Sequence, residues 1–212
     1  MTLYLSIIFI GMAIASGLGV AYFSAYAGTH EWWVIVTMVV ATSLALFLCD
    51  LIFAGSIKLL PQKWFDPYKK KYKISKREKS FYELLGINYW KDKVPEVGKL
   101  VGYDKTSVGD LTADNLFKFL TESAYGEIIH YFCLLSSVII AVIYFFIPID
   151  AINGLFWGVV LPCALVNFFL NVPPILIQRY NRPRLMRIHQ LLVKKEQKAA
   201  DAISQDSEVV LL

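Results

Sequence analysis

The chain has 212 residues, of which 57% are hydrophobic and 18% charged, and its formal net charge is +4. This apolar composition excludes an ordinary soluble domain and indicates that part of the surface faces lipid. The three cysteines lie apart inside apolar runs, so we expect neither a disulfide framework nor a metal site.

Four apolar stretches are long enough to cross about 30 Å of hydrocarbon as helices, which rise about 1.5 Å per residue. They cover residues 3–26, 32–60, 128–147 and 152–178. The first lacks the basic flank of a signal peptide and is too long for a signal core, so we expect it to be retained. Short links at residues 27–31 and 148–151 join the stretches in pairs. The sequence therefore predicts an all-α integral membrane protein with four transmembrane helices in two hairpins.

Lysine and arginine collect between the hairpins and after them. Thirteen of the 21 lie between Lys63 and Lys118, seven lie between Arg179 and Lys198, and the two short links contain none. By the positive-inside rule, these basic segments and both termini are predicted to be cytoplasmic, in the cell membrane. The predicted units are an N-terminal hairpin (1–60), a cytoplasmic basic and aromatic loop with an interfacial helix (61–127), a C-terminal hairpin with an arginine motif (128–185), and a cytoplasmic tail (186–212).

The predicted cytoplasmic loop mixes basic residues with aromatic ones such as Trp64, Tyr68 and Trp90. This mixture suits a membrane surface or the phosphates of a ligand. Attraction of juxtamembrane lysines to anionic lipid is the simpler explanation for the run at residues 69–71. We do not expect a nucleic-acid partner, because four helices would hold this loop at a bilayer.

Two rows of small residues run along the first predicted helix, each at a spacing of four. One row is Gly11, Ala15 and Gly19, and the other is Ala13, Gly17 and Ala21. Small side chains let a second transmembrane helix approach the backbone closely. Both rows are therefore interpreted as packing surfaces.

Ionisable residues inside apolar stretches are candidates for function, because each is costly in lipid. Asp50 lies near the predicted cytoplasmic edge, where it could snorkel, pair with Lys58 or line a cavity. Glu127 and His130 stand three residues apart and so share a helix face, where the carboxylate could orient the imidazole. The alternative is that His130 is an ordinary interfacial histidine.

The fourth predicted helix carries Asn167 and Asn171 on one face, with Gln178 near the same stripe. Pro173 and Pro174 are predicted to break this helix, since each removes a backbone hydrogen bond. A kink satisfied by neighbouring helices is the alternative.

Three arginines follow at the predicted helix exit: Arg179, Arg182 and Arg184. Guanidinium groups grip phosphate or carboxylate oxygens well, although the positive-inside rule alone would explain one or two of these arginines.

The segment from residue 171 to residue 185, NVPPILIQRYNRPRL, closely resembles the C-terminal motif of the glycosyl-4,4'-diaponeurosporenoate acyltransferase family. Further matches occur in the same order at KWF (63–65), EK (78–79), FY (81–82), WKDK (90–93), PE (95–96) and EIIH (127–130). Together they span residues 63–185. The chain departs from the family pattern in its N-terminal hairpin and in a polar insert at residues 98–115.

The resemblance implies a membrane enzyme that esterifies a sugar hydroxyl of a carotenoid glycolipid of the staphyloxanthin type. We therefore expect transfer of a fatty acyl chain from acyl-CoA or acyl-carrier protein to a lipid or glycolipid hydroxyl at the cytoplasmic face, with no tightly bound cofactor. A base, oxyanion donors and a head-group site are then needed. The expected residues are His130 as base oriented by Glu127, Arg179, Arg182 and Arg184 on the donor phosphates, Asn171 and Asn181 as positioners, and Trp90, Lys91 and Asp92 as further binding candidates.

No serine occupies a G-x-S-x-G elbow and no His-x-x-x-x-Asp string is present, so a direct transfer is favoured over a covalent intermediate. Two other functions stay open on the residues alone. One is a non-catalytic membrane scaffold or lipid-binding subunit. The other is a small membrane methyltransferase or reductase, although no G-x-G-x-x-G or Walker string is found. The sequence leaves the oligomeric state open.

Overall fold

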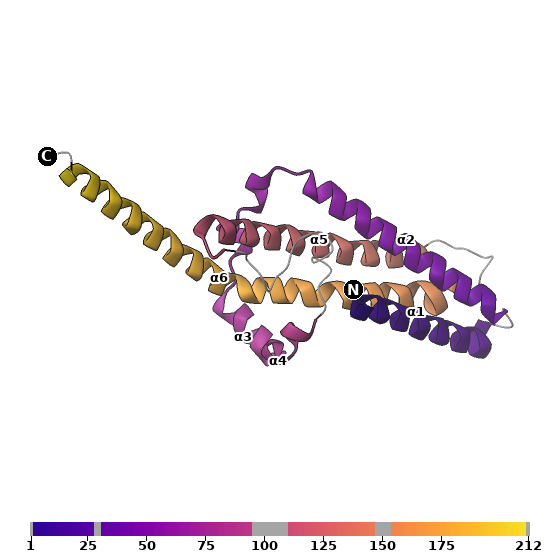
Figure 1. Ribbon diagram of the computed structural model, residues 1–212. Coiled ribbons are helices and arrows are strands. Elements are labelled where there is room, and N and C mark those ends of the chain that lie inside the picture. The colour runs from indigo at the N-terminus through magenta and orange to yellow at the C-terminus, as the bar shows by residue number, and fades with distance from the viewer. Residues whose placement is uncertain (1, 28–30, 95–109, 147–153, 211–212) are drawn as a thin grey trace.

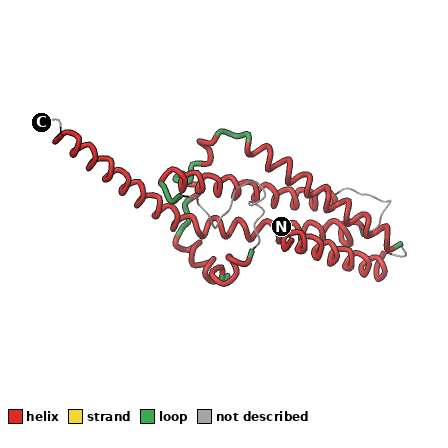
Figure 2. Tube along the Cα trace, viewed as in Figure 1, coloured by secondary structure: helices red, strands yellow, loops and turns green. Residues whose placement is uncertain are grey.

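The computed structural model describes residues 2–27, 31–94, 110–146 and 154–210. Its four long helices are α1 (Thr2–Tyr22), α2 (Trp32–Lys58), α5 (Ala113–Phe146) and α6 (Leu161–Val210). Turns of π-helix extend α1 at η1 (Phe23–Ala27) and precede α6 at η6 (Phe156–Val160). All four contain windows apolar enough to cross a membrane, and the described residues include no strand (Figures 1 and 2). This confirms the predicted all-α fold class and the four transmembrane helices of a multi-pass membrane protein.

The outer faces of these helices are apolar. Phe9 on α1, Ile52 on α2, Val142 on α5 and Phe169 on α6 are all large hydrophobic side chains that are exposed. In water an apolar surface of this extent would be strongly unfavourable, because each Å² costs about 25 cal/mol. Lipid is therefore the solvent of these faces.

One of the two small-residue rows on α1 packs as predicted. A Cβ added at Gly19 would lie 2.5 Å from the carbonyl oxygen of Gly158 in η6, and Ala15 is buried. A Cβ at Gly11 would lie 2.7 Å from Cγ1 of Val166 in α6. By contrast, a Cβ at Gly17 would meet nothing within 4 Å, so the second row is not a packing surface among the described residues.

The second hairpin is longer than the sequence indicated, because α5 begins at Ala113 and not near residue 128. Leu116, Leu120 and Ala124 are buried at a spacing of four, which gives this first part of α5 a packed face. Its 34 residues span about 51 Å and the 50 residues of α6 about 75 Å, well beyond a bilayer core. Figure 1 shows the C-terminal end of α6 projecting beyond the other helices.

The prediction that prolines break the fourth helix is wrong. Helix α6 continues through Pro173, Pro174 and Pro183. Two residues before the first proline, the side-chain amide of Asn171 donates to the carbonyl oxygen of Asn167 over 2.9 Å. Packing along α5 holds the turns on both sides of the prolines, so the lost amide hydrogen bonds do not end the helix.

Short helices fill the segment between the hairpins. They are η2 (Gln62–Phe65), η3 (Lys70–Tyr72), α3 (Lys76–Leu84), α4 (Ile87–Trp90) and η4 (Lys91–Lys93). The ring of Phe65 stacks on Tyr125 of α5 with centroids 3.7 Å apart, which fixes the start of this segment to the second hairpin. The Ser75 hydroxyl caps α3 by accepting a hydrogen bond from the Glu78 amide, and α3 contacts α6.

Several predicted features lie outside the described residues. They are the centre of the first link (28–30), the whole second link (148–151), the PE pair at residues 95–96 and most of the polar insert at 98–115.

Candidate functional site

Antiparallel packing of α5 on α6 brings polar residues from the two helices together in pairs. Towards the hairpin link, Ser137 of α5 meets Asn167 of α6. One to two turns further along, His130 meets Asn171, and beyond that Glu127 meets Arg179. The pairs form a line inside an apolar bundle, where each polar group needs a partner.

The hydrogen bond between His130 and Asn171 determines which imidazole nitrogen is basic. Nδ1 of His130 lies 2.8 Å from Oδ1 of Asn171. The Asn171 amide is oriented by its own Nδ2 group, which donates to the carbonyl and to Oδ1 of Asn167 over 2.9 and 3.2 Å. Since an amide oxygen only accepts, Nδ1 of neutral His130 carries the proton. Nε2 is then left with the basic lone pair.

Asp50 of α2 joins the same cluster. Its Oδ1 accepts a hydrogen bond from the Ser136 hydroxyl over 3.2 Å. Lys58, one of the partners considered for Asp50, instead pairs with Glu122 of α5. The bundle therefore contains a carboxylate, an imidazole and amides within one polar cluster.

Glu127 is buried and has two arginine partners. Its Oε1 accepts a hydrogen bond from Nη1 of Arg179 over 2.6 Å, and its Oε2 accepts one from Nη1 of Arg182. The prediction that Glu127 orients His130 therefore differs from the structure, in which Asn171 holds His130. Helix spacing placed both residues on one face of α5, but α6 supplies different partners to each.

Glu78 of α3 completes an ionic network of two carboxylates and two guanidiniums. Nε of Arg179 donates to its Oε1 over 2.5 Å, and the Tyr82 hydroxyl donates to the same oxygen. Burial alone would raise the pKa of the Glu78 carboxyl, but the bonds and charge from Arg179, with the Tyr82 bond, outweigh it and lower that pKa. Burial, aided by Glu78, raises the pKa of Tyr82 to about 12. The network ties the inter-hairpin segment to both helices of the second hairpin.

Arg182 is enclosed by protein. It is fully buried, and Nη2 donates to the carbonyl of Ser123 over 3.4 Å. Its guanidinium also lies 5.0 Å from the centroid of the Tyr72 ring. Burial and the nearby Glu127 charge raise the pKa of Tyr72 to about 12. The positive charge of Arg182 is thus satisfied within the fold.

A second group of predicted residues lies on the accessible surface near the exit of the hairpin. Nζ of Lys91 donates to Oδ1 of Asn181 over 3.4 Å, and Nε1 of Trp90 donates to the carbonyl of Leu85 over 3.0 Å. Arg184 and Asp92 are exposed. Among the described residues Arg184 has no carboxylate partner. This basic surface is separate from the buried network.

Sequence reasoning did not assign a site role to Glu78, Ser136 or Tyr72. Glu78 was visible as part of the EK match, whereas Ser136 and Tyr72 carried no signal, because their partners come from helices distant in the sequence. Among the described residues, no three His, Cys, Asp or Glu side chains gather as a metal site.

The fold and site define a polytopic helical membrane protein with a histidine in its core and a basic surface at one end. A sequence profile of the glycosyl-4,4'-diaponeurosporenoate acyltransferases matches residues 61–191. The chain belongs to this acyltransferase family of carotenoid glycolipid biosynthesis.

Curated relatives share that description. The protein of Staphylococcus haemolyticus strain JCSC1435 is 29% identical over 143 residues, covering 65% of this chain and 77% of the relative. Those of Staphylococcus aureus strains MRSA252 and Newman are 26% and 27% identical over 145 residues, covering 64% of this chain and 78% of each relative. No solved structure matches.

Proposed function

We propose that this acyltransferase moves a fatty acyl chain from acyl-CoA or acyl-carrier protein to a sugar hydroxyl of a glycolipid, at the cytoplasmic face. The glycosyl-diaponeurosporenoate named for its relatives makes a carotenoid glycolipid the acceptor of choice. The observation that carries the proposal is the His130–Asn171 hydrogen bond, which leaves a basic Nε2 inside an apolar bundle.

In the proposed step, Nε2 of His130 takes the proton from the acceptor hydroxyl as its oxygen attacks the thioester carbonyl. The new C–O bond forms an ester, the C–S bond breaks, and the departing thiolate recovers the proton from the imidazolium. Asn171 holds the imidazole, and Asp50 stabilises its positive charge.

The three arginines have two different proposed roles. Arg179 and Arg182 hold Glu127 and Glu78 and so fix α3 against the hairpin. The donor's phosphates or carrier surface are assigned to Arg184, Lys91 and Asn181, which are less enclosed. Trp90 and Asp92 border this surface.

The cytoplasmic location is supported by charge. The basic residues at 63–93, Lys118 and the basic residues at 179–198 lie before and after the apolar stretches of the second hairpin in the sequence, and His130 stands midway along α5, near the start of its apolar stretch at residue 128. Positive charge of this density is retained on the cytoplasmic side. An acyl chain can then enter the site from the bilayer while its head group stays in water.

The test is acyl transfer by purified protein in liposomes, with radiolabelled palmitoyl-CoA or palmitoyl-carrier protein and a glucosylated carotenoid acid as acceptor. His130→Ala should lower the rate at least about 100-fold, as loss of a general base does. His189→Ala is the matched control, since His189 contacts Tyr68 outside the polar cluster. A His130→Ala protein with near-normal turnover would overturn the base assignment.

A further inference from the structure

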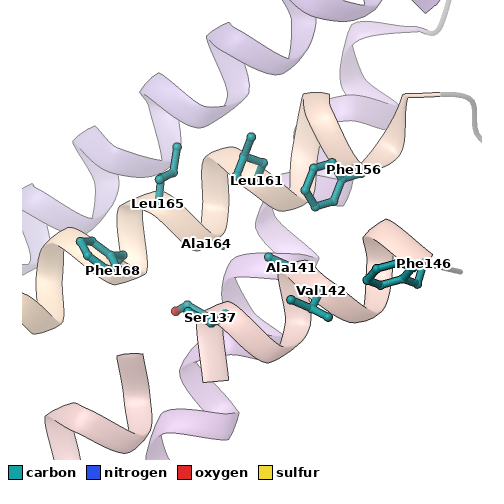
Figure 3. Close-up of a pocket in the computed structure, with 10 residues that line it drawn as sticks. Ser137, Ala141, Val142, Phe146, Phe156, Leu161, Ala164, Leu165 and Phe168 are labelled. Carbon is teal, nitrogen blue, oxygen red and sulfur yellow. The ribbon is translucent and has the colours of Figure 1, made fainter. Parts of the chain in front are cut away.

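An apolar groove lies between α5 and α6, on the link side of the polar cluster. Its volume is about 270 Å³, and nine of its ten lining residues are apolar. Figure 3 shows Ala141 on α5 and Ala164 on α6 on the facing sides of the two helices. The only lining side chain with a polar atom is Ser137.

One lining residue of the groove, Ser137, also belongs to the line of polar pairs that includes His130. The Ser137 hydroxyl at its end accepts a hydrogen bond from Nδ2 of Asn167 over 2.9 Å. Asn167 accepts from Asn171, which in turn holds His130. A chain of three hydrogen bonds thus joins the imidazole to the mouth of the groove.

We propose that this groove holds the distal part of the transferred acyl chain and that Ala141 and Ala164 set the chain length the enzyme accepts. The inference rests on the proposed function. The acyl chain is bonded directly to the carbonyl carbon that reacts, whereas the sugar of a glycolipid separates the acceptor's apolar part from the reacting hydroxyl. The apolar space that begins about 10 Å along α5 from the base therefore suits the acyl chain.

Distances along α5 indicate which carbons of the acyl chain would reach the groove. Ser137 stands seven residues after His130, about 10 Å along α5, and the groove continues for nine residues to Phe146, about 13 Å. Chain atoms near the carbonyl lie beside the polar cluster. Only the carbons beyond this first stretch enter the groove, so short chains end before it and long chains fill it.

Alanine at two facing positions leaves the space that a larger side chain would occupy. Ala164 is buried, and Ala141 lies across from it in Figure 3. A phenylalanine at 141 would take up part of the 270 Å³ groove. Since one methylene in an apolar pocket changes selectivity about 10-fold or more, loss of several chain positions is readily measured.

The experiment is competition between octanoyl-CoA and palmitoyl-CoA in the liposome assay, with the two ester products separated by mass spectrometry. For Ala141→Phe, and to a smaller degree Ala141→Val, the palmitoyl-to-octanoyl ratio should fall at least about 10-fold while octanoyl transfer is kept. Ile139→Phe is the matched control, because Ile139 is on the same helix, exposed and outside the groove lining. Its ratio should equal that of the wild type.

The outcomes separate the two proposals. A wild-type ratio in folded Ala141→Val and Ala164→Leu proteins, with transfer still abolished by His130→Ala, would overturn the groove assignment alone. Altered acceptor selectivity at an unchanged chain ratio would also overturn it, because the acceptor would then occupy the groove. Absence of any acyl transfer by the wild type would refute the proposed function itself.

Discussion

Replacing Glu127 by glutamine is expected to destabilise the fold severely. The substitution leaves the guanidinium of Arg182, which is fully buried, and that of Arg179, which is largely buried, without a central carboxylate. Removing one member of a buried ion pair costs about 3–5 kcal/mol, because the remaining charge stays desolvated. Glu78 still neutralises part of Arg179, so we expect a loss near the lower limit, about 3 kcal/mol.

The assay is thermal unfolding of purified protein in a mild detergent, with the amount of folded protein in membranes as a second readout. Glu127→Gln should lower the Tm by several degrees, since about 1 kcal/mol shifts the Tm by about 2–4 °C in a chain of this size. Glu122→Gln is the matched control. Its partner is Lys58, and both side chains are nearly half exposed, so that pair contributes less than about 1 kcal/mol.

Equal melting temperatures for Glu127→Gln and Glu122→Gln would refute the reasoning. A second variant separates the contribution of charge to stability from that of packing. Glu127→Leu combined with Arg182→Met replaces the buried pair by apolar side chains, and it should recover much of the lost stability. A double variant no more stable than Glu127→Gln would mean that the network contributes by its geometry and not by charge compensation.

Three further predictions concern the other parts of the site. Asn171→Ala should lower kcat at least about 10-fold and change the pH profile of the rate, because the imidazole loses the bond that fixes its tautomer; an unchanged profile would contradict this role. Arg184→Gln should raise the donor KM several-fold in low salt without changing the acceptor KM, and equal changes in both would argue against a donor site. The folded pKa of Glu78 is lowered, so its stabilising effect is present above its usual pKa of 4.5 and is lost as the pH falls through the lower folded value. The Tm difference between wild type and Glu78→Gln should thus be full at pH 7 and shrink below about pH 4.5, whereas a constant difference would contradict the assignment.

The membrane helices were predictable because lipid imposes a strong local rule. A helix must carry about 20 apolar residues to cross the bilayer, and that signal is contained in the stretch itself. The start of α5 was missed because residues 113–127 are amphipathic, and their helix is stabilised by packing on α6 and by contacts such as the Glu196 bond to the Ala113 amide. Such contacts join positions far apart in the sequence.

The sequence indicated which polar residues share a helix face, but it did not indicate how they pair between helices. Helix spacing correctly brought Glu127 and His130 to one face of α5, yet the partner of each depends on the register of α6 against α5. Arg182 and Arg184, two residues apart, lie on opposite faces of α6, and packing against α5 decides that Arg182 is the buried one. Periodicity within one helix does not say which face is buried.

We propose that His130 drives acyl transfer to a glycolipid hydroxyl. The most direct measurement is untargeted lipidomics of source cells that lack the gene, complemented with either the wild type or His130→Ala. We predict that cells without the gene and cells with His130→Ala accumulate the same glycolipid lacking one fatty acyl group, and that the wild type restores its ester. A lipidome unchanged by loss of the gene, or full restoration by His130→Ala, would contradict the account.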